Sequence, residues 1–226
     1  MTITLSLSSR TYTLDAIICD MDGLLIDSEG PSAQAWRDAM AAYDVTLNDD
    51  DIDDMFGLRI DEDAALLIQR YDIAASVADL VAAKSARMLE LVHQHLEPMP
   101  GATQFVNWLV EHDVTRALAT SGLVDYAAVC LEKVGFADAF ALRVTGGEVP
   151  RGKPAPDIFL EAASRLGVAP ERCLVFEDAP HGVAAANAAG MPVIAVPNAE
   201  TIKLTFPPFN ARAVSLKEAL TWLSLS

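Results

Sequence analysis

The chain has 226 residues, enough for one α/β domain with or without a small appended domain, and too few for a multi-enzyme array. Hydrophobic residues make up 52% and aromatic residues 7%, a composition typical of helices packed on a sheet, which excludes a disordered protein. The 32 acidic residues outnumber the 16 Lys and Arg residues, so the formal net charge is −16 and a nucleic-acid-binding face is not expected. An acidic protein that works on anions therefore needs a metal or a few well-placed cations.

The beginning of the chain has none of the features of a secretory signal. The segment MTITLSLSSRTYTL lacks a basic start, a continuous apolar stretch and a small-residue cleavage site, and no run of about 18 apolar residues follows. Cys19, Cys130 and Cys173 lie far apart in apolar segments, which favours reduced core cysteines. We therefore expect a cytoplasmic protein without a membrane span.

The first part of the chain predicts one buried strand followed by a helical insertion. The first dozen residues alternate loosely and fit an extra edge strand, and Asp15 to Asp20 reads as a buried strand. From about residue 31 to residue 99 no strand pattern occurs. Helical spacing instead covers Ser32 to Tyr43, Asp61 to Tyr71 and Ala75 to Leu96. We expect residues 31–99 to form a helical cap domain, with turn-prone linkers at Gly30-Pro31 and at residues 98–101.

From residue 100 onward, strand and helix patterns alternate. The predicted strands are Thr115 to Thr120, Ala141 to Thr145, Arg172 to Glu177 and Pro192 to Val196, and the predicted helices are Ala102 to His112, Leu123 to Val134, Pro156 to Leu166 and His181 to Ala189. This alternation predicts an α/β fold with a doubly wound parallel sheet, built from residues 1–30 and 100–226. Ligands bind at the carboxyl edge of such sheets.

Two carboxylates follow the first predicted strand. Asp20 and Asp22 stand at its carboxyl end, and Gly23 permits the turn that aims Asp22 back over the site. For one such pair alone, a turn or a helix cap is the favoured explanation, so the functional interpretation depends on the other strand ends.

Phosphate-binding groups stand at the next positions along the predicted sheet edge. Thr120 and Ser121 follow the second core strand, where a hydroxyl and free backbone N–H groups can hold phosphoryl oxygens. Lys153 precedes a helix in Gly152-Lys153-Pro154 and can pair with carboxylates and with a bound phosphoryl group. Ordinary turn chemistry and a solvated surface lysine are the alternatives.

Two further carboxylates, Glu177 and Asp178, end the strand that begins near Arg172. Four acidic side chains at adjoining strand ends repel one another unless a cation lies between them. Oxygen ligands in an octahedral site favour magnesium, so we expect Mg²⁺ as cofactor.

The four motifs together resemble those of the haloacid dehalogenase superfamily. They are DMDGLLIDSE at residues 20–29, ATS at 119–121, GKPAPDIF at 152–159 and FED at 176–178, in the family's order and spacing over nearly the whole chain. The resemblance implies a Rossmann-like hydrolase core, and a helical insert right after the first motif is similar to the cap of the β-phosphoglucomutase-like branch. Ala179 stands where the family commonly has Ser, which removes one hydroxyl near the acids.

The resemblance also implies a role for each matched residue. Asp20 matches the nucleophile and Asp22 the general acid/base. Thr120, with Ser121 beside it, and Lys153 match the phosphate-binding residues. The metal ligands would be Asp20, the Asp22 backbone carbonyl, Glu177 and Asp178. The reaction implied is hydrolysis of a small phosphate ester through an aspartyl-phosphate.

Three features bear on the choice within the family. Asp22 favours phosphoryl transfer over dehalogenation, because only an alkoxide leaving group needs protonation. Ser32 stands where β-phosphoglucomutase-like mutases have a cap histidine, which favours a phosphatase over a phosphosugar mutase. The segment FGLRID at residues 56–61 resembles the cap loop of bacterial 2-deoxyglucose-6-phosphate and hexitol-phosphate phosphatases. Arg59 is therefore the expected specificity residue, with an exposed helix-start arginine as the alternative.

A protein that only senses a phosphometabolite is a third possibility, but binding alone does not need both Asp20 and Asp22. We expect a monomer that acts on a small-molecule phosphate ester. His93 and His95 point to different faces of a predicted helix, and His181 is expected at a helix start, so none of the three is predicted to be catalytic.

Overall fold

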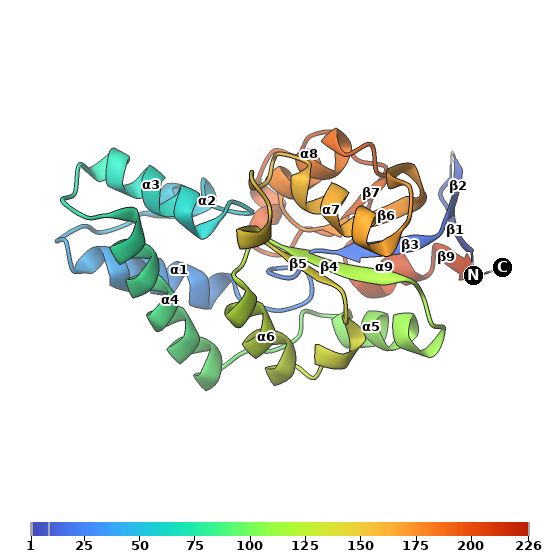
Figure 1. Cartoon of the computed structure of the whole chain (residues 1–226), viewed down its shortest axis with the longest axis horizontal. Helices are drawn as coiled ribbons and strands as arrows, with labels where there is room; N and C mark the ends of the chain where they lie inside the picture. The colour runs from blue at the N-terminus through green and yellow to red at the C-terminus, as the bar shows by residue number, and fades with distance from the viewer. Residues whose placement is uncertain (1, 9, 226) are drawn as a thin grey trace.

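A six-stranded parallel sheet forms the centre of the computed structural model, which describes residues 2–8 and 10–225. The strand order is β5-β4-β3-β6-β7-β8, so the chain winds outward from β3 in both directions (Figure 1). The strands are β3 (Ala16–Cys19), β4 (Arg116–Thr120), β5 (Arg143–Thr145), β6 (Cys173–Glu177), β7 (Val193–Ala195) and β8 (Ala211–Arg212). The predicted doubly wound α/β fold is confirmed, and β8 is an addition at one edge.

Helices cover both faces of the sheet. They are α5 (Ala102–Glu111), α6 (Val124–Lys133), α7 (Asp157–Leu166), α8 (Pro180–Ala188) and α9 (Leu216–Leu220), with short 3-10 turns at Ala137–Ala139, Gly146–Glu148, Pro170–Arg172 and Thr201–Lys203. Side chains of β3 alternate between two apolar clusters: Ile17 and Cys19 face the side of α5, whereas Ala16 and Ile18 face the side of α7. β3 is therefore buried on both faces, which explains its continuous apolar sequence. All three cysteines are free and buried, as predicted.

Four helices follow β3 and lie together at one end of the core, on the left in Figure 1. They are α1 (Glu29–Ala41), α2 (Asp49–Asp53), α3 (Ile60–Tyr71) and α4 (Val77–Gln94), and we call them the cap. Trp36, Met40, Leu67 and Leu80 belong to an apolar cluster of their own. α1 includes Gly30-Pro31, because proline is tolerated in the first turn of a helix. The expected linker at that point is therefore helical, and the domain division at residues 31 and 99 stays a prediction.

The beginning of the chain does not extend the parallel sheet. β1 (Ile3–Ser6) and β2 (Thr11–Leu14) form a hairpin, and β1 also pairs antiparallel with β9 (Leu223–Leu225). The prediction of an extra edge strand is corrected to a separate three-stranded sheet that joins both ends of the chain, at the end of the core opposite the cap (Figure 1).

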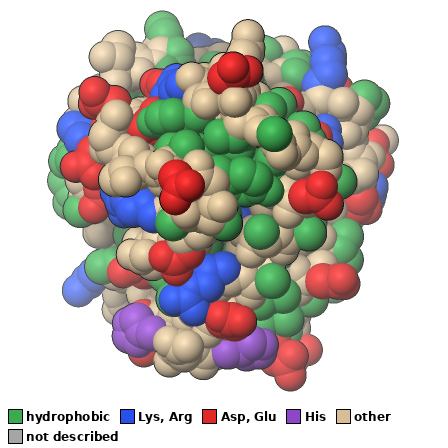
Figure 2. Space-filling view, turned by 90° about the vertical axis from the view of Figure 1, so that its left-hand side faces the viewer, with side chains coloured by type: hydrophobic (Ala, Val, Ile, Leu, Met, Phe, Trp, Pro, Cys, Tyr) green, Lys and Arg blue, Asp and Glu red, His purple; other side chains and the backbone are tan. Residues whose placement is uncertain are grey.

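The surface at the cap end carries acidic and basic side chains interspersed around an apolar area (Figure 2). A nucleic-acid-binding face would instead gather basic side chains. Within residues 2–8 and 10–225, no helix combines the length and apolar character that a membrane crossing requires.

Candidate active site

Asp20 lies at the centre of the carboxyl edge of the sheet, directly after β3. Its side chain is buried, and Lys153 Nζ lies 2.5 Å from Asp20 Oδ1, 2.6 Å from Glu177 Oε1 and 3.3 Å from the carbonyl oxygen of Ala119. Burial raises the pKa of Asp20 to about 8, against the opposing attraction of Lys153. The lysine is itself buried, yet the two carboxylates raise its pKa above the usual range. It is therefore a fixed cation between Asp20 and Glu177.

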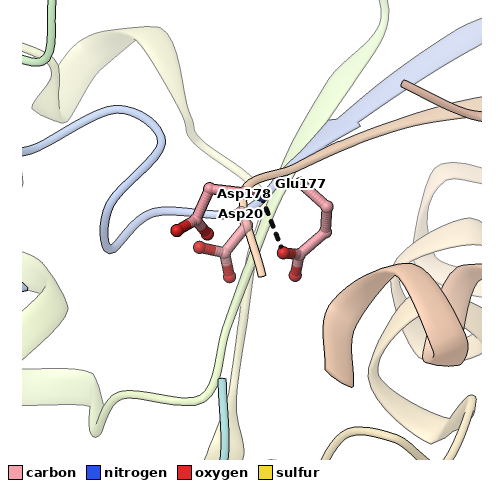
Figure 3. Close-up of side chains that lie close together, drawn as sticks. All are labelled: Asp20, Glu177 and Asp178. Carbon is pink, nitrogen blue, oxygen red and sulfur yellow. Dashed lines mark hydrogen bonds between the residues drawn. The ribbon is translucent and has the colours of Figure 1, made fainter. Parts of the chain in front are cut away.

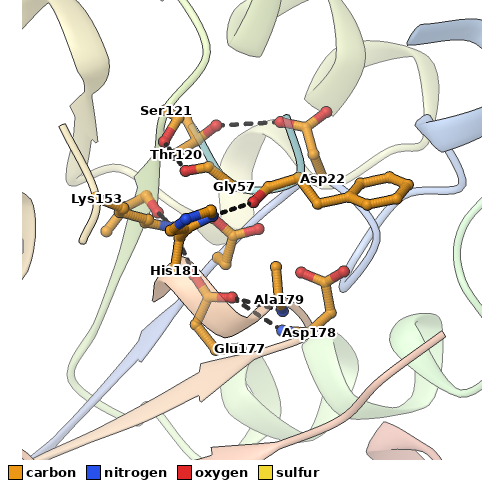
Figure 4. Close-up of polar contacts among 12 residues, drawn as sticks. Asp22, Gly57, Thr120, Ser121, Lys153, Glu177, Asp178, Ala179 and His181 are labelled. Atoms are coloured by element: carbon orange, nitrogen blue, oxygen red, sulfur yellow. Dashed lines mark hydrogen bonds and ion pairs between the residues drawn. The ribbon is translucent and has the colours of Figure 1, made fainter. Parts of the chain in front are cut away.

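Asp22 is held by three hydroxyl groups. Ser28 and Tyr126 donate hydrogen bonds to Asp22 Oδ1 over 2.7 and 2.6 Å, and Thr120 donates to Oδ2 over 3.2 Å. The backbone N–H of Gly122 in turn donates to the Thr120 hydroxyl. The Asp22 carboxylate is thus oriented by residues at the end of β4, on α6 and just before α1, and Figure 4 shows the contact with Thr120.

Asp20, Glu177 and Asp178 form a buried acidic cluster with ligand atoms within 4.8 Å of one another (Figure 3). Glu177 Oε2 accepts hydrogen bonds from the backbone N–H groups of Asp178 and Ala179, so this carboxylate is fixed from behind. Asn198 donates to Asp178 Oδ2 over 2.9 Å. Burial and the adjacent Glu177 raise the pKa of Asp178 well above its usual range. A compact set of hard oxygen donors with excess negative charge fits a magnesium ion.

Only glycine fits at position 23, in the turn after Asp22, because side chains near the acidic cluster fill the space that a Cβ would need. Gly23 has φ of +73°, and a Cβ there would lie 2.6 Å from Asn198 Nδ2 and 2.8 Å from Glu29 Oε1, besides overlapping Asp178 Oδ2. The turn predicted at Gly23 is present, and it brings the first motif directly against Asp178 of the fourth.

Ser121 and Arg59 were predicted as site residues, but both make their polar contacts between cap and core and none with the acidic cluster. Ser121 Oγ donates to the carbonyl oxygen of Gly57, although Ser121 still lines the cavity described below. Arg59 pairs with Asp61 over 2.8 Å, and its Nη1 lies 3.3 Å from the carbonyl oxygen of Val149. Arg59 is not among the described residues that line the cavity. The structure therefore places its guanidinium on the contact between cap and core, and its role in specificity stays a prediction.

His181 and Ala179 also belong to this contact. His181 Nδ1 lies 2.8 Å from the carbonyl oxygen of Phe56 in the cap. Ala179 is buried in the cap's apolar cluster, and a Cβ at Gly57 would lie 3.4 Å from its methyl group. The family's usual serine at this position would face the cap loop.

A cavity of about 260 Å³ lies between the cap and the acidic cluster, near the lower end of the range for small-molecule sites. Asp20, Asp22 and Asp178 are at its core side. Its lining is mostly apolar, and the cap contributes Ser32, Trp36, Asp63 and Lys84 among others. The site can therefore hold a small organic group against the two predicted catalytic aspartates.

Sequence reasoning missed several residues of this site, namely Ser28, Glu29, Asp63, Lys84, Tyr126 and Asn198. Ser28 and Glu29 fall inside the first motif and Tyr126 lies five residues after Ser121, in the first turn of α6, so proximity to the motifs was an available signal. Asp63 and Lys84 look like polar positions of amphipathic helices, and nothing local distinguishes them from solvent-facing residues.

Comparisons with known proteins agree with this geometry. The family model described as haloacid dehalogenase-like hydrolase matches residues 14–190. The probable pseudouridine-5'-phosphatase of Drosophila melanogaster is 37% identical over 80% of this chain and 80% of that protein. Hexitol phosphatase B of Escherichia coli K12 is 33% identical over 82% of this chain and 84% of its own length.

Solved structures superpose on most of the chain. CbbY from Rhodobacter sphaeroides, in complex with phosphate, superposes with a TM-score of 0.84 at 24% identity and covers 91% of this chain and 96% of its own; this likeness concerns the fold. The putative β-phosphoglucomutase from Thermotoga maritima superposes with a TM-score of 0.69 at 27% identity, over 92% of this chain and 97% of its own.

Proposed function

The chain belongs to the haloacid dehalogenase-like hydrolases, in the β-phosphoglucomutase-like and CbbY-like branch, and we propose that it is a magnesium-dependent phosphatase of small sugar phosphates. Its family and curated relatives make it a phosphoric monoester hydrolase that acts on phosphorylated metabolites. The choice of sugar phosphates and the reaction route are the parts proposed here.

One observation carries the proposal. Asp20 is buried at the carboxyl edge of the sheet, its Oδ1 is fixed by Lys153, and it lines the cavity together with Asp22. A purely structural aspartate would bury its charge against the lysine alone and would have no open space in front of it. Asp20 instead lines the cavity, so its second carboxylate oxygen can contact a molecule bound there.

The metal site belongs to the same arrangement. Asp20 and Asp178 would hold Mg²⁺ with their carboxylates, Asp22 would contribute its backbone carbonyl, and Glu177 completes the acidic cluster. When bound, the ion neutralises the phosphoryl oxygens and so makes the phosphorus accessible to an anionic nucleophile.

The residues of the chain then divide the reaction into two displacements. In the first, an oxygen of Asp20 forms a bond to phosphorus while the bond from phosphorus to the ester oxygen breaks, and Asp22 gives its proton to that oxygen. In the second, Asp22 takes a proton from water, the water oxygen bonds to phosphorus, and the bond between phosphorus and Asp20 breaks. To hold the phosphoryl oxygens, Lys153 would exchange its long bond to the Ala119 carbonyl and the Thr120 hydroxyl would turn from Asp22.

A phosphosugar mutase is the alternative that the fold also permits. Ser32 lines the cavity at the position where such mutases have a histidine, and its short hydroxyl favours a site that admits water. Hydrolysis is therefore the activity supported by this lining residue.

The test replaces Asp20 with Asn and measures magnesium-dependent release of phosphate from a panel of sugar phosphates and from 4-nitrophenyl phosphate. We expect Asp20→Asn to lose turnover of every substrate and keep a cooperative thermal transition, because an amide oxygen is a poor nucleophile. Asp27→Asn, an exposed residue of the same loop, is the matched control and should retain the wild-type rate. Turnover by Asp20→Asn at the wild-type rate would refute the assignment.

A further inference from the structure

Asp63, on helix α3 of the cap, has a buried carboxylate oxygen without a hydrogen-bond partner. The residue is only 6% exposed, and among the described residues its Oδ1 is the one buried side-chain polar atom without a hydrogen-bond partner. Buried polar groups in proteins are nearly always paired, and an unpaired carboxylate oxygen weakens the fold. Asp63 lines the cavity, so a bound molecule can supply the missing partner.

Lys84 faces the same part of the cavity from α4. Its Nζ lies 5.5 Å from the centre of the buried Trp36 ring, and the lysine lines the cavity with Asp63 and Glu29. Burial lowers the pKa of Lys84, and the surrounding carboxylates of Asp63, Asp22 and Glu29 oppose that shift. The cap end of the cavity therefore combines the Lys84 ammonium, the Asp63 carboxyl group and the Trp36 ring, whereas Glu29 lies beside Asp178.

The charges at this end select between classes of leaving group. A second phosphate would meet Asp63 as well as Lys84, so the acidic side chain opposes attraction by the one ammonium. Hydroxyl groups meet no such opposition, because they donate to a carboxylate and accept from an ammonium. The remaining lining is mostly apolar and includes Met88 and Phe56, which suits the carbon skeleton of a small molecule.

We propose that Asp63 and Lys84 form the subsite for the leaving group, in which Asp63 accepts hydrogen bonds from neighbouring hydroxyls of an uncharged polyol or sugar. The substrate class is therefore a monophosphate ester of a small polyhydroxylated compound, and a bisphosphate is disfavoured. This inference rests on the proposed phosphatase function and deepens it.

The experiment compares wild type with Asp63→Asn, which keeps the shape of the side chain and removes its charge. The probes are sorbitol 6-phosphate, fructose 1,6-bisphosphate and 4-nitrophenyl phosphate, whose leaving group has no hydroxyl to offer Asp63. We expect kcat/KM of Asp63→Asn to fall about 10- to 100-fold for the sorbitol ester, the loss of one charge-assisted hydrogen bond or two, and to stay within about threefold for the aryl ester. The disadvantage of the bisphosphate relative to the sorbitol ester should shrink in the variant.

The melting temperature of Asp63→Asn distinguishes the proposed role from a structural one. A structural role of Asp63 would lower it, whereas the proposed role predicts that it rises. Burial raises the pKa of Asp63 well above its usual range, so the ionised group destabilises the folded protein once the pH exceeds the ordinary pKa of an aspartate. Asp63→Asn should therefore melt at a higher temperature than wild type at pH 8. Asp50→Asn, an exposed acid on α2, is the matched control and should match wild type in both measurements.

The outcomes separate the two proposals. The subsite would be overturned if wild type and Asp63→Asn had equal kcat/KM on the sorbitol ester. It would also be overturned if the variant lost equally on the sorbitol and aryl esters and melted at a lower temperature. A wild-type preference for the bisphosphate would overturn the substrate class. If wild type and Asp50→Asn hydrolyse none of the three esters with magnesium, the proposed function itself fails. Lys84→Met provides the same kinetic comparison if Asp63→Asn does not fold.

Discussion

Gly182→Ala is a one-methyl change that the structure predicts to be harmful. Gly182 lies within α8, where alanine is normally better than glycine by about 1 kcal/mol. A Cβ at this position, however, would overlap both carboxylate oxygens of Glu177. The end of a glutamate side chain usually moves aside, but this one is 1% exposed and bound by Lys153 and two backbone N–H groups.

The magnitude follows from these contacts. Moving the Glu177 carboxylate breaks one or two charge-assisted hydrogen bonds, each worth about 1.5–3 kcal/mol. After the helix-propensity gain of about 1 kcal/mol, the free energy of unfolding should fall by about 0.5–5 kcal/mol. Displacement of a group in an active site by about 1 Å can reduce the rate about a hundredfold, so we expect kcat/KM to fall by about that factor.

The assays are thermal unfolding and steady-state phosphate release over a magnesium titration. Gly30→Ala in α1 is the matched control, because nothing lies within 4 Å of a Cβ there, and it should be at least as stable as wild type and fully active. Wild-type activity and magnesium dependence in Gly182→Ala would refute the view that a pinned Glu177 organises the site.

Three further substitutions test separate parts of the mechanism. Asp22→Asn should lose about a hundredfold or more in kcat for sugar phosphates and much less for 4-nitrophenyl phosphate, whose leaving group needs little protonation; equal losses would mark Asp22 as structural. Asp178→Ala should raise the magnesium concentration for half-maximal activity at least about tenfold, and an unchanged value would place the metal elsewhere. Arg59→Ala should lower kcat/KM about fivefold for sugar and aryl esters alike, because its long bond to the Val149 carbonyl joins cap and core. A loss confined to sugar esters would instead support the prediction that Arg59 is a specificity residue.

The parts of the fold that sequence predicts are those with strong local signals. β3 and β6 are continuous apolar runs that end in acids, and the parallel sheet aligns these ends whatever the loops do. Asp20 and Glu177 were predictable for this reason. The pairing of β1 with β9 was not, because it joins strands of four and three residues from opposite ends of the chain.

Which charged residue near the start of α3 faces the cavity falls outside local prediction for a geometric reason. Arg59 precedes α3 and pairs with its own neighbour Asp61, whereas Asp63, one turn later, points into the cavity. Only the packing of α3 against α4 decides which of these charged residues faces the site, and a polar helix position in a sequence carries no such information.

The central claim is that Asp20 carries the phosphoryl group during turnover. Sodium borohydride reduces an acyl phosphate to an alcohol, so wild type quenched during turnover of sorbitol 6-phosphate with magnesium should contain homoserine at position 20, as read by peptide mass spectrometry. The modification should be absent without substrate and in Asp20→Asn. Homoserine at another acidic residue, or an unmodified Asp20 in protein that is turning over under the same quench, would contradict the account.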